Sequence, residues 1–376
     1  MIYFDNAATG GFKPSAVTDS AITTIKFMNA NPGRSGHRLS VKGAETVLKT
    51  RMILSSFFCS SDPDRVIFTK NATEALNLLI LGTAKKGGHI ITTVYEHNSV
   101  YRPIEYLKQN YGVTCTVIDC EDIFNEVKNS INDNTYLVII NHVSNVTGHE
   151  NDLFEVKRAI GEKDIIFASD VAQSAGHTNI DMSGLGVNAI CGAGHKAMCG
   201  IMGSGFLIFD TKTEISPITF GGTGTQSKSL TQPEFYPEKL ESGTLNLPAI
   251  CALGEGANYV KDNLKLFGET LSTLTTALIG ELEKIPKIRL KSKPNKYGIV
   301  SFSVDGLTSG EVADILSNEY DIAVRGGLHC APLIHKKLGT EEGGLVRVSL
   351  APQNTLREVY TFIKAIGRIA SGRVFM

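Results

Sequence analysis

The chain has 376 residues and a formal net charge of −1, with 42% hydrophobic and 20% charged residues. This composition is typical of a folded globular protein of about two domains, and it excludes a disordered one. A net charge near zero gives no electrostatic sign of binding to nucleic acid or to an anionic membrane. The longest apolar runs, such as residues 136–140, are far shorter than the roughly 20 residues that span a bilayer.

The 7 cysteines are scattered along the chain, and no two of them form a CxxC pair. An odd number without paired spacing argues against a disulfide framework and against a zinc site, so we expect no metal. Residues 1–9 lack the basic and apolar regions of a signal peptide. These features predict a protein of the reducing cytoplasm.

Short apolar segments alternate with amphipathic segments between residues 65 and 209. The predicted strands are residues 65–69, 89–93, 114–119, 135–141, 164–169, 189–192 and 205–209, and helices are predicted at 73–84, 99–111 and 153–160. This alternation predicts an α/β fold whose large domain has a mostly parallel seven-stranded sheet covered on both faces. In such sheets ligands bind at the carboxyl ends of the strands, so polar residues just after a strand are candidates for a site.

The remainder of the chain predicts a smaller α/β domain. A long helical stretch at residues 248–282 is followed by strands at 298–304 and 345–350 and by helices at 310–319 and 355–370. We therefore expect a large domain of residues 15–255 and a small domain that combines residues 1–14 with 256–376. The turn-rich segments 5–11 and 31–36 have no role that the residue pattern alone assigns.

Lys196 follows a short apolar strand in the sequence Gly-Ala-Gly-His-Lys. The stretch also matches the glycine fingerprint of dinucleotide-binding proteins, but that fingerprint requires a helix to begin inside it. Three further glycines and another strand follow at once and leave no room for a helix. A tight loop remains, in which Lys196 is either an ordinary surface lysine or one held rigidly enough to form a Schiff base.

Asp170 follows the apolar strand at residues 164–169, and Gln173 lies three residues further on. An aspartate in this position is compatible with a simple helix cap. Together with Lys196 it gains a more specific meaning, because pyridoxal phosphate (PLP) requires a lysine for its aldehyde and an acid opposite its pyridine nitrogen.

Two further polar positions follow strands. Thr73 and Glu74 open a predicted helix, where free N–H groups and a hydroxyl would form a phosphate cradle, although an ordinary capping box would look alike. His97 follows the next strand, where it would either stack on a ring or be a plain loop residue.

Cys330 lies beside His329 in a glycine-rich loop that begins with Arg325. A nearby cation favours the nucleophilic thiolate, whereas the other cysteines lie mostly in apolar contexts that predict burial. Arg347 is a charged residue inside an apolar strand, which is costly unless the charge is paired. Its partner is either a substrate carboxylate or the carboxylate of a structural ion pair.

Taken together and in this order, these motifs resemble class V aminotransferase-fold enzymes of the cysteine desulfurase group, most closely the branch that includes selenocysteine lyases. The resemblance extends from Tyr3-Phe-Asp-Asn-Ala-Ala-Thr to Arg347-Val-Ser-Leu-Ala-Pro-Gln-Asn-Thr. It implies a PLP-dependent aminotransferase-like fold (fold type I) and a homodimer whose active sites lie at the subunit interface.

The resemblance also implies a reaction. L-Cysteine would be converted to L-alanine, and the sulfur would be carried as a persulfide on Cys330 to an acceptor protein in sulfur metabolism, such as iron–sulfur cluster assembly. L-Selenocysteine is an alternative substrate. A PLP transaminase or epimerase on the same fold is a further alternative, which would need Lys196 and Asp170 but not Cys330.

The roles that the resemblance implies fall into three groups. The catalytic residues would be Lys196, Cys330 and His97. The cofactor would be held by Lys196, His195, Asp170 at the pyridine nitrogen, Gln173 at the ring hydroxyl, His97 stacked on the ring, Ala72 and Thr73 at the phosphate, and Gly243 and Thr244 of the partner subunit. The substrate would be bound by Asn145 and Arg347 at its carboxylate, with His37 and Arg325 nearby.

Two positions depart from the family pattern. Ala193 stands where the family often has a phosphate-binding serine, so the phosphate would depend more on Thr73 and Thr244. The cysteine loop reads Gly-Leu-His-Cys, where the better-known members have two adjacent histidines. The second departure leaves the sulfur acceptor, and with it the physiological substrate, open.

Overall fold

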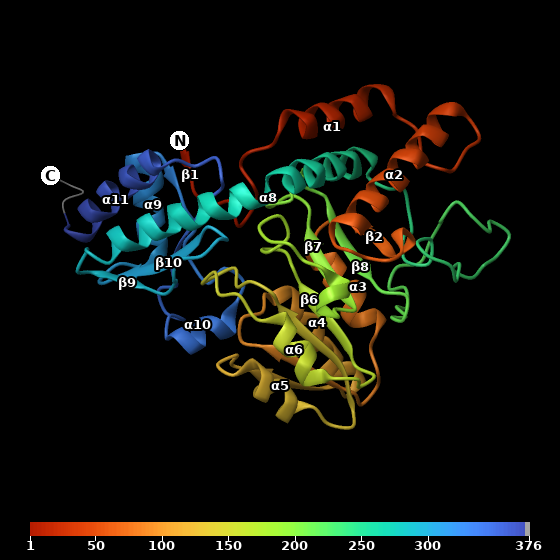
Figure 1. Ribbon diagram of the computed structural model, residues 1–376, viewed down its shortest axis with the longest axis horizontal. Helices are drawn as coiled ribbons and strands as arrows, with labels where there is room; N and C mark the ends of the chain where they lie inside the picture. The colour runs from red at the N-terminus through yellow and green to blue at the C-terminus, as the bar shows by residue number, and fades with distance from the viewer. Residues whose placement is uncertain (373–376) are drawn as a thin grey trace.

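The computed structural model describes residues 1–372, which form a large and a small part joined by one long helix (Figure 1). The large part contains the central sheet. The small part contains the N-terminus and most of the chain after the long helix (Figure 1).

The central sheet has seven strands, and its order places the middle of the chain at the centre of the fold. From one edge to the other the strands are β2 (Val66–Thr69), β8 (Gly205–Phe209), β7 (Ala189–Ala193), β6 (Ile166–Asp170), β5 (Thr135–Asn141), β3 (His89–Thr93) and β4 (Thr114–Ile118). Strand β8 is antiparallel to both of its neighbours, and the other strands run in one direction. This confirms the predicted mostly parallel sheet.

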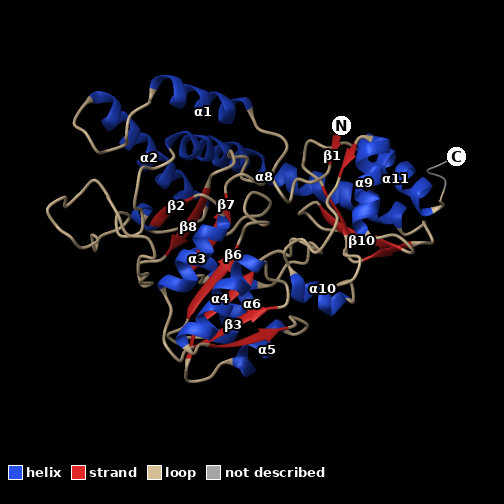
Figure 2. Ribbon diagram, turned by 180° about the vertical axis from the view of Figure 1, so that it is seen from behind, coloured by secondary structure: helices blue, strands red, loops and turns tan. Residues whose placement is uncertain are grey.

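Helices cover both faces of this sheet (Figure 2). They are α1 (Ser15–Phe27), α2 (Arg38–Phe57), α3 (Ala72–Gly82), α4 (Asn98–Tyr111), α5 (Ile123–Ser130), α6 (Leu153–Ile160) and the short α7 (Met182–Leu185), with a 3₁₀ turn, η1, at Pro63–Arg65. In β5, Leu137 and Ile139 pack with the residues of α3 and α4, whereas Val138 and Ile140 pack with those of α2 and α6. Because both faces are buried, the strand reads as a continuous apolar run.

The long helix α8 (Leu247–Leu282) belongs to both parts of the molecule. Leu253 packs in the core of the large part, whereas Leu274 and Leu278 pack in the core of the small part. Although α8 has 36 residues, no helix within residues 1–372 is both long enough and apolar enough to cross a bilayer. The expected boundary between residues 255 and 256 falls inside this continuous helix, and the domain division therefore stays a proposal.

The small part is built on a three-stranded antiparallel sheet in the order β12-β10-β9. Its strands are β9 (Ile288–Leu290), β10 (Ile299–Val304) and β12 (Val346–Ser349), and a separate parallel pair joins β1 (Ile2–Tyr3) to β11 (Ile322–Ala323). The helices of this part are α9 (Ser309–Tyr320), α10 (Pro332–Leu338) and α11 (Leu356–Ala370). The pair β1–β11 attaches the N-terminus of the chain to the small part.

A buried ion pair fixes the loop that precedes α8 to the sheet. Arg51 in α2 and Glu241 lie 2.5 Å apart, and their side chains are only 5% and 6% exposed. Glu241 also accepts a hydrogen bond from the backbone N–H of Phe68 at 2.7 Å. The Arg51 guanidinium stacks on the Phe68 ring. The loop that carries Gly243 and Thr244 is therefore anchored to β2.

Removal of one partner should reveal the cost of a buried, unpaired charge. We expect Glu241→Ala to lower the free energy of unfolding by about 3 to 5 kcal/mol, because Arg51 would remain buried without its counter-charge. Urea denaturation followed by circular dichroism measures this change, and Glu319→Gln, at an exposed position, is the control. A loss as small as that of the control would show that the ion pair does not anchor the loop.

Candidate active site

A pocket of about 480 Å³ lies where β5, β6 and β7 end. Because parallel strands end at one edge of a sheet, the residues that follow them meet there. Most of the residues that the sequence analysis selected line this pocket, namely Ala72, Thr73, His97, Asn145, Asp170, Gln173, His195 and Lys196. Residues from separate segments of the large part therefore converge on one cavity.

Lys196 lies in a tight turn directly after β7. The turn has no room for a side chain at Gly194, where a Cβ would come within 2.4 Å of the Ser204 hydroxyl. Burial lowers the pKa of Lys196 from its ordinary 10.5 to about 8, and the negative charge of Asp170 opposes that shift. At pH 7 about a tenth of the amine is therefore uncharged and nucleophilic, against less than about a thousandth for an ordinary lysine.

The carbonyl oxygen of His195 is held by three donors from the N-terminal segment. It accepts hydrogen bonds from the Gly10 N–H at 3.0 Å, the Lys13 ammonium at 2.9 Å and the Thr9 hydroxyl at 3.3 Å. We call residues 5–13 the N-terminal strap. The strap fixes the backbone directly before Lys196.

Asp170 ends β6, and its residue is 3% exposed. Burial raises the pKa of its carboxyl group, whereas a hydrogen bond from the Ala172 N–H, at 2.9 Å, and the charge of Lys196 lower it. Asn141 on the neighbouring strand is in register with Asp170, and its side chain also favours the carboxylate. The site thus contains a buried carboxylate that a protonated ring nitrogen would match.

Glu96, which no sequence motif singled out, directly precedes His97 at the start of α4. Its side chain is fully buried, and its Oε1 accepts hydrogen bonds from the Thr93 hydroxyl at 2.8 Å and the Asn141 N–H at 2.7 Å. Burial raises the pKa of Glu96 to about 8, and the charge of Asp170 adds to the shift. At neutral pH the Glu96 carboxyl is therefore mainly protonated and adds little negative charge beside Asp170.

His97 caps the N-terminus of α4. Its Nδ1 accepts the Ser99 N–H at 3.1 Å, so the proton of the neutral ring lies on Nε2. Burial and the charge of Lys196 lower the pKa of His97 to about 4, and the ring is neutral at pH 7. The Ser99 hydroxyl lies 2.7 Å from that of Thr73, which joins His97 to the start of α3.

The N-terminus of α3 is suited to an anion. Asn71 caps the helix by accepting the Glu74 N–H at 2.9 Å. The N–H groups of Ala72 and Thr73 have no carbonyl one turn before them, and the helix dipole favours negative charge at this end. Ala193, at the end of β7, lines the same pocket without a hydroxyl group. The anion cradle thus consists of α3 N–H groups and the hydroxyls of Thr73 and Ser99.

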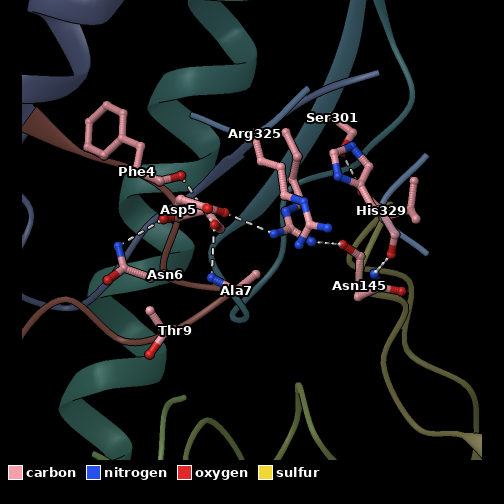
Figure 3. Close-up of polar contacts among 12 residues, drawn as sticks. Phe4, Asp5, Asn6, Ala7, Thr9, Asn145, Ser301, Arg325 and His329 are labelled. Atoms are coloured by element: carbon pink, nitrogen blue, oxygen red, sulfur yellow. Dashed lines mark hydrogen bonds and ion pairs between the residues drawn. The ribbon is translucent and has the colours of Figure 1, made fainter. Parts of the chain in front are cut away.

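Arg347 lies in β12 and is almost completely buried, with 1% of its surface exposed. Its Nη2 forms an ion pair with Asp5 at 3.0 Å, and its Nη1 donates to the carbonyl oxygen of Asn145 at 3.0 Å. The Asn145 amide in turn donates to the carbonyl oxygen of His329 at 2.8 Å (Figure 3). The structural ion pair that the sequence left open as a partner of Arg347 is therefore present.

Cys330 is exposed at the tip of its loop. Its carbonyl oxygen accepts the Asn98 N–H at 2.7 Å, which docks the loop beside His97 at the start of α4. The Arg325 guanidinium lies 3.9 Å from the sulfur, and its positive charge is of the sign that stabilises a thiolate. His329 and Cys330 have positive φ angles of 50° and 58°, so the loop has a tightly turned backbone.

Arg325, Cys330 and Arg347 do not line this pocket, and three further predicted residues lie outside it as well. His37 caps α2, where its Nδ1 accepts the Ser40 N–H at 3.3 Å. Gly243 and Thr244 are exposed, and the Gly243 carbonyl oxygen accepts a hydrogen bond from Arg34 at 2.8 Å. A single chain does not bring these residues to Lys196.

The fold and this arrangement define an aminotransferase-like α/β enzyme with a buried lysine at the carboxyl edge of its sheet. The chain belongs to the class-V aminotransferase family, whose model matches residues 2–362. This confirms the family and the fold class that the sequence motifs predicted.

The similar proteins bear a common name. A solved structure of an apo cysteine desulfurase from Thermococcus onnurineus is 30% identical with a TM-score of 0.90, covering 99% of this chain and 95% of that one. A probable cysteine desulfurase of Pyrococcus abyssi is 33% identical over 381 residues, which are 96% of this chain and 92% of that protein. A probable cysteine desulfurase of Methanothermobacter thermautotrophicus is 30% identical, covering 98% and 94%.

The protonated state of Glu96 should appear in the pH dependence of stability. Its folded pKa of about 8 lies above the ordinary 4.5, so the folded chain keeps a proton that the unfolded chain releases between these values. The contribution of Glu96 to the free energy of unfolding should therefore fall as pH rises from about 5 to about 8. Glu96→Gln cannot release this proton and should lose that part of the pH dependence.

Urea denaturation of both proteins at several pH values in this range measures the effect. The difference in unfolding free energy between Glu96→Gln and the wild type should shift in favour of the variant as pH rises. Glu319→Gln, at an exposed position, should follow the wild type. A difference that stays constant with pH would show that Glu96 is already ionised in the folded protein.

Proposed function

We propose that this protein is a PLP-dependent cysteine desulfurase, which converts L-cysteine to L-alanine and carries the sulfur on Cys330. The observation that carries the proposal is the convergence of Lys196 and Asp170 in one pocket, with the Cys330 loop hydrogen-bonded to the start of α4 beside His97. The relatives named cysteine desulfurase support it.

The residues of the pocket fit PLP. The amine of Lys196 would bind the aldehyde, Asp170 would face the pyridine nitrogen, and the α3 N-terminus with Thr73 would hold the phosphate. His97 would stack on the ring. Gln173 lines the pocket, but its amide already donates to the Ala7 carbonyl oxygen at 3.0 Å. Its second N–H and its carbonyl oxygen remain, and either would meet the ring hydroxyl. When bound, PLP would hold the substrate's amino group and withdraw electrons from its α-carbon.

Lys196 is the group that we assign to proton transfer at the α-carbon. Its pKa of about 8 gives a neutral amine close to the operating pH, which suits a general base. The negative charge of Asp170 raises the pKa of Lys196 and so limits the decrease that burial causes. His97 carries its proton on Nε2 and would act as a relay on the same side of the site.

Cys330 is the group that we assign to sulfur transfer. In this step the thiolate attacks the sulfur of the substrate, a sulfur–sulfur bond forms and the bond between the β-carbon and sulfur breaks. The electron pair goes to the β-carbon, which takes up a proton to become the methyl group of L-alanine. Arg325, 3.9 Å from the sulfur, would stabilise the attacking thiolate. The resulting persulfide would pass to a sulfur-acceptor protein.

Arg347 and Asn145 are the residues that we assign to the substrate carboxylate. The Nε of Arg347 is buried and has no hydrogen-bond partner among the described residues, and a carboxylate would satisfy it. His37 would lie near the mouth of the site. The proposed location is the cytoplasm, because Cys330 has to remain a reduced thiol.

A homodimer is part of the proposal, because it would bring Gly243 and Thr244 of one subunit to the phosphate in the other. The surface of α1, α2 and the loop that follows β8 supports this. Exposed apolar side chains on these elements include Ile22, Ile25, Phe27, Leu48, Met52, Phe220 and Leu230. Apolar side chains gathered on one side of a molecule are typical of a subunit interface.

Replacement of Cys330 separates a desulfurase from a transaminase. We expect Cys330→Ala to retain the cofactor and to lose alanine formation from L-cysteine by about 100-fold or more, because the attacking sulfur is gone. Alanine and sulfide are measured after incubation with L-cysteine. Cys59→Ala, which replaces another exposed cysteine, is the matched control and should form alanine normally.

A variant that forms alanine from L-cysteine at the wild-type rate would favour the transaminase-like alternative. The same assay with L-selenocysteine tests the lyase alternative, because the weaker carbon–selenium bond depends less on the nucleophile. Alkylation of the wild type after one turnover should place the extra sulfur on Cys330.

The subunit arrangement is tested by mixing two inactive variants. Lys196→Ala removes the reactive amine, and Thr244→Asp places a negative charge where the phosphate of the partner subunit's cofactor would lie. A heterodimer has one site with neither change, so random exchange should restore about a quarter of the wild-type activity. Recovery is measured after dissociation and reassociation. Heterodimers that form without any activity would show that Thr244 acts within its own subunit.

A further inference from the structure

The guanidinium of Arg347 is oriented by the protein before any ligand arrives. Its two contacts, with Asp5 and with the Asn145 carbonyl oxygen, involve different nitrogens. An arginine side chain has more N–H donors than these two contacts use. Because the residue is 1% exposed, water cannot occupy the remaining donors freely. The buried side chain thus retains unused donors that a ligand anion would satisfy.

Asp5 is held in place by the strand that carries Arg347. The Ser349 N–H donates to the Phe4 carbonyl oxygen at 2.7 Å, and the Ala7 N–H donates to the Ser349 hydroxyl at 2.9 Å. Both bonds flank Asp5, which lies between Phe4 and Ala7 (Figure 3). Ser349 is two residues after Arg347 in β12. The carboxylate therefore meets the guanidinium from one fixed side.

The charges around Arg347 explain why its guanidinium needs the Asp5 carboxylate as a counter-charge. Arg325 and Lys196 are further cations close enough to influence one another and Arg347. Burial lowers the pKa of Arg347, and the charge of Asp5 opposes that shift. A buried guanidinium without a counter-charge is strongly unfavourable. Without Asp5 the guanidinium would keep only its hydrogen bond to the backbone carbonyl oxygen of Asn145, and one bond to one nitrogen does not fix its orientation.

We propose that Asp5 is a positioning residue, which fixes the guanidinium of Arg347 so that its unused N–H groups face the α-carboxylate of the amino-acid substrate. Asp5 itself does not touch the substrate. The inference rests on the proposed function, which supplies an amino acid as the ligand. It assigns a role to the N-terminal strap in the recognition of the substrate.

A competing arrangement would give the opposite result. If Asp5 occupied the donors that the substrate carboxylate needs, its removal would strengthen the binding of the carboxylate. The unpartnered Nε of Arg347 favours positioning, since at least one donor stays unused while Asp5 is bound. The sign of the change in carboxylate affinity therefore decides between the two arrangements.

The test compares two ligands that differ in the carboxylate group alone. L-Alanine has the α-carboxylate, and L-alaninamide has a neutral amide in its place. Binding of each to the holoenzyme is measured by isothermal titration calorimetry in the wild type, Asp5→Asn and Asp5→Ala. We expect Asp5→Ala to weaken L-alanine binding by about 10- to 30-fold.

Asp5→Asn should weaken it less, because its amide oxygen still accepts a hydrogen bond from Arg347. Binding of L-alaninamide should change by less than about twofold in either variant, since it makes no charged contact with Arg347.

Asp305→Asn is the matched control, since it removes the carboxylate of an exposed ion pair with Arg289 in the same part of the molecule. It should bind both ligands as the wild type does. Equal losses for L-alanine and L-alaninamide in the Asp5 variants would overturn the proposal in favour of a structural role, and tighter L-alanine binding would overturn it in favour of competition.

If Asp5→Ala does not fold, Asp5→Asn decides alone by the same comparison. Failure of the proposed function is seen separately, in a wild type that forms no alanine from L-cysteine. The binding comparison of L-alanine with L-alaninamide does not depend on that assay, so the two failures can be told apart.

Discussion

The site depends on the way in which parallel strands end at one edge of the central sheet. Asn141 at the end of β5 is in register with Asp170 at the end of β6, and Asp170 is in register with Cys191 in β7. Residues far apart in the sequence are thereby brought side by side, and the turn after β7 adds Lys196. The direction of the strands, rather than any local motif, places the carboxylate and the amine in one cavity.

Two pairs of opposite charge lie in and beside this cavity, and burial neutralises a third acid. Asp170 opposes Lys196, and Asp5 opposes Arg347. Glu96 would be a second negative charge close to Asp170, but burial raises its pKa to about 8. A buried acid with no cation beside it is more stable with its proton than without it. The pocket thus keeps its negative charge at the position where a protonated ring nitrogen would need it.

Much of the fold and of the pocket was predictable from sequence because the signals were local. An apolar run in the sequence predicts each of the strands that end at or just before Thr73, His97, Asp170 and Lys196. The predicted strands at residues 89–93, 135–141 and 205–209 coincide with β3, β5 and β8. Helices α1 and α2 were not predicted. Their apolar residues are divided between buried positions, such as Leu54, and exposed ones, such as Met52, which obscures the helical period.

Asp5 and Glu96 were missed for a different reason. Their importance comes from contacts with residues that are distant in sequence, Arg347 for Asp5 and Asn141 for Glu96. Nothing in the neighbouring residues shows that Glu96 is buried. Its position next to His97 does show that it lies near the predicted site. Long-range pairing has to be known before such a residue can be selected.

Asn145 connects the two assigned chemical tasks of the site. Its carbonyl oxygen accepts a hydrogen bond from Arg347, and its amide donates to the His329 carbonyl oxygen in the cysteine loop. The same loop is bonded to Asn98 through the Cys330 carbonyl oxygen. Because Asn145 contacts the arginine through its backbone carbonyl oxygen and the loop of the small part through its side-chain amide, a displacement of this residue would alter both contacts. The proposed carboxylate site and the proposed nucleophile therefore belong to one hydrogen-bonded unit, which begins at Asp5.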